Sequence, residues 1–162
     1  MWGDSDMEFQ LRKADETDWE FIWGLRVETM KFVICQSYGW DDHVQRTYAA
    51  ESLNGEIVLV DGEAVGVLTL FDWGDQLHLA WMAIIPSLQR RGLGTALVRH
   101  CQRLAEEARK PLTLQVLRAN PAVRLYERCG FQVYGHSEPD RWLMQWGTPT
   151  MTDRTDASFQ RD

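Results

Sequence analysis

The sequence lacks the features of membrane, exported and disulfide-rich proteins. No apolar run approaches the roughly 18 residues of a membrane span. Residues 1–6 have neither the basic start nor the apolar core of a signal peptide. The three cysteines, Cys35, Cys101 and Cys129, are far apart and form neither a CxxC pair nor a Cys/His metal spacing. These absences predict a cytoplasmic protein with free thiols, without a membrane partner and without a metal site.

Basic charge is also scarce. Seventeen Lys and Arg residues stand against 24 Asp and Glu, which gives a net charge of −7 at pH 7. Such a chain repels a phosphate backbone, so no nucleic-acid partner is expected. The same sign is compatible with a cationic small substrate such as an amine. A local basic cluster offers positive charge to an anionic ligand and consists of Arg90, Arg91, Arg99 and Arg103.

The length of 162 residues suits one domain with one sizeable core. We expect a single domain over 7–146, a flexible start at 1–6 and a flexible polar tail at 147–162, where Thr, Asp and Gly are frequent. The hydrophobic pattern predicts the order β-α-α-β-β-β-α-β-α-β-β. A meander of hairpins followed by a βαβ step implies an α/β (α+β) fold with a mixed sheet and helices on both faces.

Local signals mark the predicted boundaries. Thr17 and Glu20 have the spacing of a capping box before the first helix. Asp61-Gly62 is the dipeptide of a tight hairpin turn. Pro86 closes a long strand. The predicted strands are 8–12, 57–60, 64–71, 76–85, 112–117, 131–136 and 141–146, and the predicted helices are 17–34, 41–52, 92–109 and 121–129.

A glycine-containing turn joins a predicted strand to an amphipathic helix and reads Gln89-Arg90-Arg91-Gly92-Leu93-Gly94-Thr95. The first turn of a helix has unpaired backbone N–H groups and a partial positive charge. Glycine lets the backbone approach a ligand closely. The turn therefore predicts a pyrophosphate site, although a plain strand-to-helix turn would use glycine in the same way. It is neither GxxxxGK[ST] nor GxGxxG.

Two motifs resemble those of the GNAT (general N-acetyltransferase) superfamily. Q-x-x-G-x-G after an apolar strand that ends in Pro resembles motif A, and N-P-A-V-R-L-Y-E-R-C-G-F from Asn120 to Phe131 resembles the second cofactor motif. The similarity covers roughly residues 8–146. Two further segments, residues 39–42 and 114–117, also resemble a bacterial subgroup of this superfamily. The resemblance implies a GNAT-like, mostly antiparallel sheet of six to seven strands with splayed central strands. It also implies an N-acetyltransferase that uses acetyl-coenzyme A.

The resemblance implies a cofactor site as well. The pantetheine arm would enter the gap between the splayed strands and pair with backbone groups of Met82, Ala83 and Ile84. A backbone N–H there would act as oxyanion donor to the thioester carbonyl. Asn120 would contact the pantetheine, although Asn before Pro is also the signal of a helix cap. Tyr126 stands closer to Asn120 than in many members, so the contact could shift to a neighbour.

Two residues are implied as catalytic. Tyr126 would give a proton to the leaving coenzyme A thiolate, or else it is a core tyrosine. His78 resembles in position the catalytic Glu of the histone-acetylating branch, and an ordinary pKa of about 6.5 suits a base. Alternation places His78 on the same face as Ala80 and Met82. A water chain is the other candidate base. Gln115 stands where some members carry a catalytic Glu, and an amide cannot act as the base.

The acceptor would be a primary amine on a small molecule or a peptide, attacking directly in a ternary complex. By resemblance, its pocket lies near the first helix, where Glu28, Tyr38, Trp40 and Asp41 stand. Aromatic rings and carboxylates can hold an ammonium, or these residues close the core. Two alternatives stay open: a non-enzymatic acyl-coenzyme A binding or sensing module, and a different phosphate binder. An exposed final strand would allow a homodimer.

Overall fold

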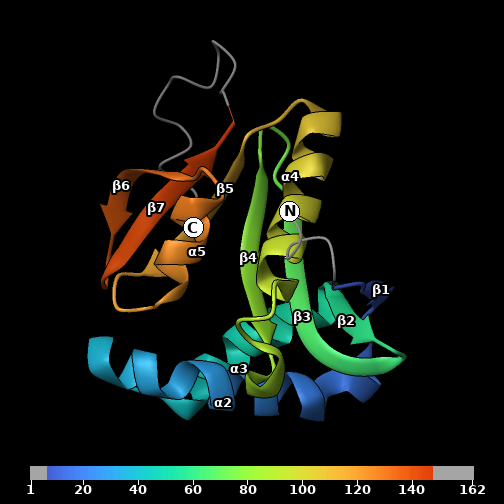
Figure 1. Cartoon of the computed structure of the whole chain (residues 1–162). Helices are drawn as coiled ribbons and strands as arrows, with labels where there is room; N and C mark the ends of the chain where they lie inside the picture. Colours follow the sequence, from blue (N-terminus) through green and yellow to red (C-terminus); the bar gives the residue numbers. More distant parts are fainter. Residues whose placement is uncertain (1–6, 148–162) are drawn as a thin grey trace.

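The computed structural model describes residues 7–147, and its strands form one mixed sheet (Figure 1). The sheet has seven strands in the order β1-β2-β3-β4-β5-β7-β6. Neighbouring strands are antiparallel except β4 and β5, which are parallel. The strands are β1 Gln10–Lys13, β2 Glu56–Val60, β3 Glu63–Asp72, β4 Leu77–Ile84, β5 Leu112–Leu117, β6 Gln132–Ser137 and β7 Arg141–Trp146. The predicted mixed, mostly antiparallel α/β fold is confirmed.

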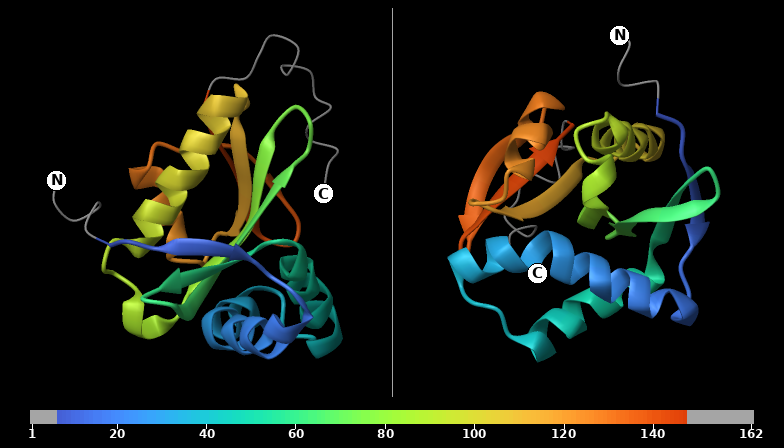
Figure 2. Two further views of the ribbon diagram at one scale, coloured as in Figure 1. Left: turned by 90° about the vertical axis from the view of Figure 1, so that its right-hand side faces the viewer. Right: turned by 60° about the horizontal axis from the view of Figure 1, so that its bottom comes forward.

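Helices cover both faces of this sheet, as predicted. The helices α2 and α3 lie together on one face, and α4 lies on the other (Figure 2). Their bounds are α2 Trp19–Ser37, α3 Asp42–Ala50, α4 Leu93–Ala108 and α5 Ala122–Arg128, with short 3-10 helices η1 Glu16–Asp18, η2 Glu51–Asn54 and η3 Pro86–Leu88. Between residues 7 and 147, no helix has both the length and the apolar character that crossing a membrane requires.

The two faces of the sheet have separate cores. The core under α4 and α5 includes Val58, Leu68, Leu93, Leu97, Leu112 and Met144. The core under α2 includes Ile22, Leu25, Ile57, Val67 and Ala83. Val67 and Leu68 are neighbours on β3 and belong to different cores, because successive side chains of a strand point to opposite faces.

A β-bulge in β4 changes this alternation. Thr69 pairs with Trp81, whereas the next residue of β3 pairs with Leu79, so Ala80 is the extra residue. As a result, Leu79 and Met82 both pack toward the α4 core. His78, which precedes Leu79, therefore faces the opposite side of the sheet from Met82. The predicted shared face of His78 and Met82 is wrong, because uninterrupted alternation was assumed.

The start of the first helix also differs from the prediction. The capping box is formed by Asp15 and Asp18 rather than by Thr17 and Glu20. Asp15 Oδ1 accepts from the Thr17 amide at 2.9 Å, and Asp18 Oδ2 accepts from the Asp15 amide at 3.0 Å. Asp18 is also held by the Arg12 guanidinium at 2.7 Å, which fixes the turn earlier in the chain. The Asp61-Gly62 turn is as predicted, with φ of 53° and 82°.

The last strand of the chain lies inside the sheet. β7 pairs with β5 on one side and with β6 on the other. The expectation of an exposed final strand is therefore wrong, and the strand at that end of the sheet is β6. The predicted flexible segments at 1–6 and 147–162 lie outside the described residues, except for Gly147.

Candidate active site

The central strands β4 and β5 separate after a short parallel pairing, as predicted. The pairs are Leu77 with Leu112, His78 with Thr113 and Leu79 with Leu114. Beyond them, β4 continues to Ile84 and β5 to Leu117 without further pairing between the two strands. Figure 1 shows the strands diverging toward α2 and α3. The facing backbone groups of the separated segments are therefore free to bond an extended ligand.

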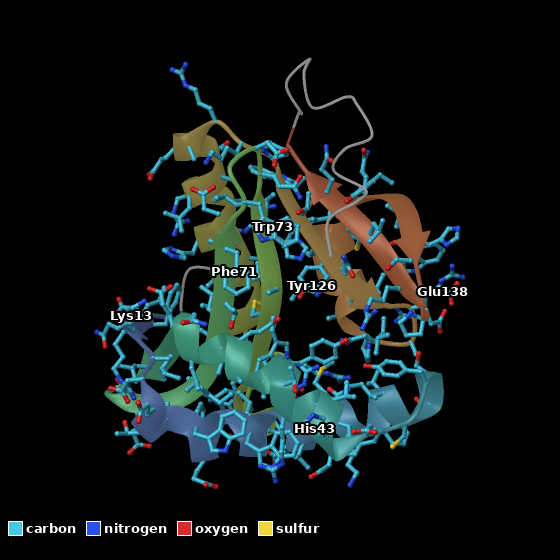
Figure 3. The ribbon with its side chains drawn as sticks, turned by 180° about the vertical axis from the view of Figure 1, so that it is seen from behind. Lys13, His43, Phe71, Trp73, Tyr126 and Glu138 are labelled. Atoms are coloured by element: carbon cyan, nitrogen blue, oxygen red, sulfur yellow. The ribbon has the colours of Figure 1, made fainter. Side chains whose placement is uncertain are left out.

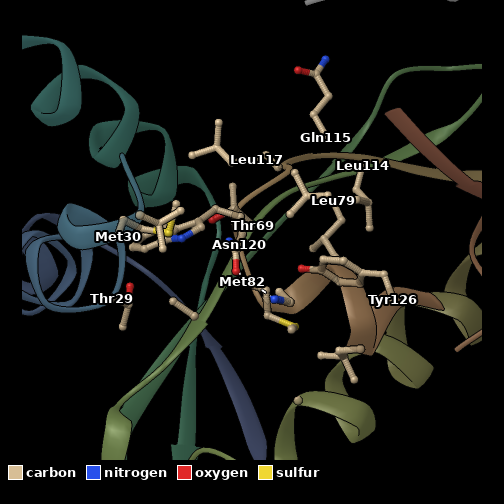
Figure 4. A pocket seen from close by; sticks show the side chains of 18 of the residues that line it. Thr29, Met30, Thr69, Leu79, Met82, Leu114, Gln115, Leu117, Asn120 and Tyr126 are labelled. Atoms are coloured by element: carbon tan, nitrogen blue, oxygen red, sulfur yellow. Dashed lines mark hydrogen bonds between the residues drawn. The ribbon is translucent and has the colours of Figure 1, made fainter. Parts of the chain in front are cut away.

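A continuous cavity of about 1610 Å³ occupies this divergence. It is larger than the usual ligand pocket of about 300–1,000 Å³, so it has room for a long cofactor and a second substrate. Its walls come from α2, the diverging strands, the start of α4, and α5 (Figure 4). Phe71, Trp73 and Tyr126 line it and lie in the middle of the molecule in Figure 3. The described residues hold no group of three or more His, Cys, Asp or Glu placed to bind a metal.

The turn before α4 presents backbone N–H groups to the cavity. Gly92 has a φ of 90°, a left-handed conformation that glycine adopts without strain. The Ala96 amide donates to the Gly92 carbonyl at 3.0 Å. Because that bond is the first of the helix, the amides of Leu93, Gly94 and Thr95 have no acceptor within the helix. The turn therefore offers several donors together with the positive end of the helix dipole.

Packing and charge complete this end of the cavity. A Cβ on Gly94 would lie 3.2 Å from Leu125 Cδ2 and 3.7 Å from Ile84 Cδ1, so a side chain there would crowd the wall. The Gln89 side chain donates to the Ile84 carbonyl at 2.9 Å and ties the turn to the end of β4. Five arginines of the described chain line the cavity, and three of them, Arg90, Arg124 and Arg128, come from this turn and from α5. Such a combination suits an anionic ligand such as a diphosphate.

Tyr126 of α5 places its phenol in the cavity wall. Its ring is 6% exposed and packs edge-on against Phe131 at 5.7 Å. The hydroxyl points into the cavity beside Leu79 and Met82 (Figure 4), and it makes no hydrogen bond to the part of the chain that the structure describes. Burial raises the pKa of Tyr126, so the phenol keeps its proton at neutral pH.

Asn120 lies two residues before α5 and also lines the cavity. Its Oδ1 accepts from the amide of Ala122, the first residue of α5, at 2.9 Å. Asn120 therefore caps the helix with its side chain, although Pro121 rather than Asn120 holds the N-cap position. Because the cap uses only the oxygen, the side-chain nitrogen remains available to a ligand. Capping and ligand contact are therefore compatible in this residue.

The comparison with protein families agrees with this geometry. The family model described as "Acetyltransferase (GNAT) domain" matches residues 48–133. This range contains the diverging strands, the glycine turn and α5. The chain belongs to the GNAT acetyltransferase family. A sequence comparison with curated proteins gives no match.

Solved GNAT structures share the architecture. The PaiA N-acetyltransferase from Thermoplasma acidophilum, solved in complex with coenzyme A, has 16% identity and a TM-score of 0.70 over 88% of this chain and 100% of its own. A ribosomal-protein alanine N-acetyltransferase from Escherichia coli has 19% identity and a TM-score of 0.64, over 89% and 97%. A GNAT acetyltransferase from Listeria monocytogenes has 18% identity and a TM-score of 0.62, over 88% and 96%. Likeness at these identities shows the GNAT fold alone.

Most of the residues predicted to bind the cofactor of this GNAT domain line the cavity. They are Met82, Ala83, Ile84, Gln89, Arg90, Gly92, Gly94, Thr95, Asn120 and Tyr126. Leu93 is fully buried in the core, so its contribution to a ligand would come from its backbone amide. Arg91 is exposed and does not line the cavity. The sequence motifs therefore converge on one wall.

The residues predicted for the acceptor pocket are not brought together. Tyr38 lines the cavity, whereas Glu28, Trp40 and Asp41 do not. The Asp41 side chain caps α3. The Trp40 indole N–H donates to Asp42 at 3.0 Å, and Glu28 is exposed on α2. Capping and packing account for these positions, so the predicted motif 39–42 serves the joint between two helices.

His78 lines the cavity but is held as a neutral ring. It stacks on Trp73 at 4.0 Å, and burial lowers its pKa to about 4. Its Nδ1 lies 2.9 Å from Thr113 Oγ1, which already accepts from Gln76 at 2.9 Å. The other acceptor within reach of the Thr113 hydroxyl, the Leu77 carbonyl, is 3.4 Å away. The hydroxyl therefore donates its hydrogen bond to Nδ1, the nearer acceptor. This arrangement favours a proton on Nε2 and makes His78 a donor rather than a base.

Arg26 is a cavity residue that the sequence analysis missed. It lies on the buried face of α2, one turn after Ile22, and is 8% exposed. Its Nε and Nη2 donate to Gln45 Oε1 at 3.1 and 2.8 Å. The guanidinium lies 5.6 Å from the Tyr48 ring and 5.0 Å from the Trp81 ring. The sequence does contain a signal for this residue, because Arg26 lies among the apolar residues that form the buried face of α2.

Proposed function

We propose that this GNAT domain transfers the acetyl group of acetyl-coenzyme A to a primary amine on a small molecule or a peptide, by direct attack in a ternary complex. The observation that supports this most is the junction of three features on one cavity: diverging strands, a helix start with unpaired amides, and the buried phenol of Tyr126. When bound, acetyl-coenzyme A supplies an activated thioester.

The cofactor is held mainly by backbone in this proposal. The amides of Leu93, Gly94 and Thr95 bind the diphosphate, with Arg90 beside them. The unpaired edge of β4 after the bulge, around Met82, bonds the amides of the pantetheine arm. Gly94 keeps the wall open because a side chain there would contact Leu125.

Tyr126 gives its proton to the leaving sulfur. Its raised pKa keeps the phenol protonated at neutral pH, and its burial excludes bulk water from the reacting atoms. We assign removal of the ammonium proton to ordered water, because a pKa of about 4 makes His78 a weak base. Its Nδ1 is also bonded to Thr113, which favours donation from Nε2.

A covalent acetyl-enzyme is not part of the proposal. Burial raises the pKa of Cys101 to about 12, so its thiol is not a thiolate at neutral pH. Cys35, Cys101 and Cys129 form no disulfide, which fits the reducing conditions of the cytoplasm, where we place the protein.

The test is release of thiol from acetyl-coenzyme A in a single turnover with a panel of primary amines. We expect release that depends on an amine, an acetylated amine in the mass spectrum and an unchanged protein mass. Calorimetry with acetyl-coenzyme A, ATP and NAD measures the cofactor preference separately. Binding of acetyl-coenzyme A without thiol release from any amine would favour a binding or sensing module. Binding of ATP or NAD alone would overturn the assignment.

A further inference from the structure

The cavity wall formed by α2 and α3 contains a buried positive charge that no carboxylate of the described residues contacts directly. Arg26 is more than nine-tenths buried, and its hydrogen bonds go to the neutral amide of Gln45. It forms no ion pair with the described residues. Buried charges in proteins are normally paired, because desolvation of an unpaired ion is costly. A buried guanidinium without an ion-pair partner in a cavity wall therefore indicates a ligand that supplies the negative charge.

Two hydrogen-bond donors meet at this position. Arg26 uses Nε and Nη2 on Gln45 Oε1, which leaves Nη1 without an acceptor in the described chain. Gln45 Nε2 in turn donates to the Tyr38 hydroxyl at 3.1 Å. That hydroxyl accepts a hydrogen bond from Gln45, and its own proton has no acceptor among residues 7–147. Arg26 and Tyr38 both line the cavity, and both contact the same amide group.

Neighbouring charges leave this position available to an anion. Arg141 lines the cavity with its guanidinium 5.8 Å from the Tyr38 ring, and among residues 7–147 it donates only to the Glu138 carbonyl, at 2.9 Å. Glu51 and Glu138 also line the cavity, but neither forms an ion pair with Arg26 or Arg141. Glu51 is close enough to attract Arg26 electrostatically, but no carboxylate of the described residues is hydrogen-bonded to Arg26 or Tyr38.

We propose that the acetyl acceptor is an amino acid, and that its carboxylate binds Arg26 and Tyr38 while its amine meets the thioester. A carboxylate has two oxygens, which match one guanidinium N–H and one phenol O–H. This inference rests on the proposed function and narrows it. A polyamine is disfavoured, because its second cation would approach the like charge of Arg26.

The experiment measures binding of reaction products, which requires no turnover. Calorimetry with coenzyme A-saturated protein compares N-acetyl derivatives of the common α-amino acids, and of ω-amino acids with two to six carbons, with their primary amides. We expect at least one acid to bind about 10- to 100-fold more tightly than its amide. Arg26→Gln should abolish this preference, and Tyr38→Phe should reduce it. Arg46→Gln is the matched control, since Arg46 is exposed, pairs with Asp42 and lies outside the cavity lining; it should keep the preference.

The ratio of the affinity for the acid to the affinity for its amide distinguishes recognition of the carboxylate by Arg26 from a purely structural role of Arg26. If no acid binds better than its amide, or if Arg26→Gln weakens acid and amide equally, the inference is overturned. Should Arg26→Gln fail to fold, Tyr38→Phe decides the outcome, and an unchanged ratio in that variant counts against the inference. Thiol release with amino acids and their amides alike would keep the proposed function and remove the inference. A binding preference for the acid without thiol release from any amine would support the carboxylate site and count against the proposed acetyl transfer.

Discussion

Tyr126→Phe removes the hydroxyl that we assign as proton donor and leaves the ring in place. The ring keeps its contact with Phe131 at 5.7 Å. Because the hydroxyl has no hydrogen-bond partner in the described chain, the free energy of unfolding should change by less than about 1 kcal/mol. A positioned proton donor contributes roughly 10²- to 10⁴-fold to a rate, or about 3–5 kcal/mol of activation free energy. We therefore expect kcat to fall by about 100-fold or more, with the Kd for acetyl-coenzyme A nearly unchanged.

The assay follows thiol release at saturating amine, with calorimetry for the cofactor Kd and denaturant titration for stability. Tyr134→Phe is the matched control, because Tyr134 is a half-buried tyrosine of β6 outside the cavity lining; its kcat should stay near wild type. Burial raises the pKa of Tyr126, so this phenol should cause no loss of activity up to mildly alkaline pH. Wild-type kcat in the Tyr126→Phe variant would assign Tyr126 to packing. Equal losses of kcat and cofactor affinity would refute the proton-donor role as well.

Three other substitutions test the site and the fold. Gly92→Glu should abolish coenzyme A binding in calorimetry while circular dichroism stays native, because an acidic side chain at a φ of 90° would meet the diphosphate; retained affinity would place the site elsewhere. Gly66→Ala should lower the free energy of unfolding by about 1–3 kcal/mol, because its Cβ would lie 2.5 Å from the Ala83 carbonyl oxygen; an unchanged denaturation midpoint would contradict this. His78→Gln should flatten the acid side of the pH–stability profile. The pKa of His78 is about 4 in the folded state and about 6.5 in the unfolded state, so the unfolded state binds the proton first as pH falls. The free energy of unfolding should therefore drop by about 3 kcal/mol between pH 6.5 and 4 in the wild type. Parallel pH–stability profiles of wild type and variant would contradict this role of His78.

The end of the cavity that we assign to the cofactor could be predicted from sequence because its signals are local. A glycine with positive φ, the first amides of a helix and an Asn cap each depend on a few consecutive residues. The order of helices and strands could be predicted in the same way, from the hydrophobic periodicity and from the residues that form turns. The bulge at Ala80 could not be predicted, because it depends on how β3 pairs with β4. That one residue reversed the face expected for Met82 relative to His78.

The acceptor end depends on residues that are far apart in the chain. Arg26, Gln45 and Trp81 come from α2, α3 and β4 and meet only when those elements pack. The sequence suggested the aromatic and acidic residues of the helix–helix joint instead, because Tyr38, Trp40 and Asp41 are adjacent. Adjacency favoured a cluster, but the folded chain uses Asp41 as a cap and leaves Tyr38 alone of these three in the cavity lining.

The two ends of the cavity also tolerate sequence change differently. Main-chain amides can bind a diphosphate whatever the side chains are, so the end that we assign to the cofactor should tolerate substitution. Solved GNAT structures at 16% and 19% identity share the fold. The wall that we assign to the acceptor instead uses side chains, and one substitution at Arg26 would change the charge of the pocket. Similarity of fold therefore carries little information about the acceptor. The acceptor has to be inferred from the unpaired polar groups of this chain, and the buried guanidinium of Arg26 is the strongest of them.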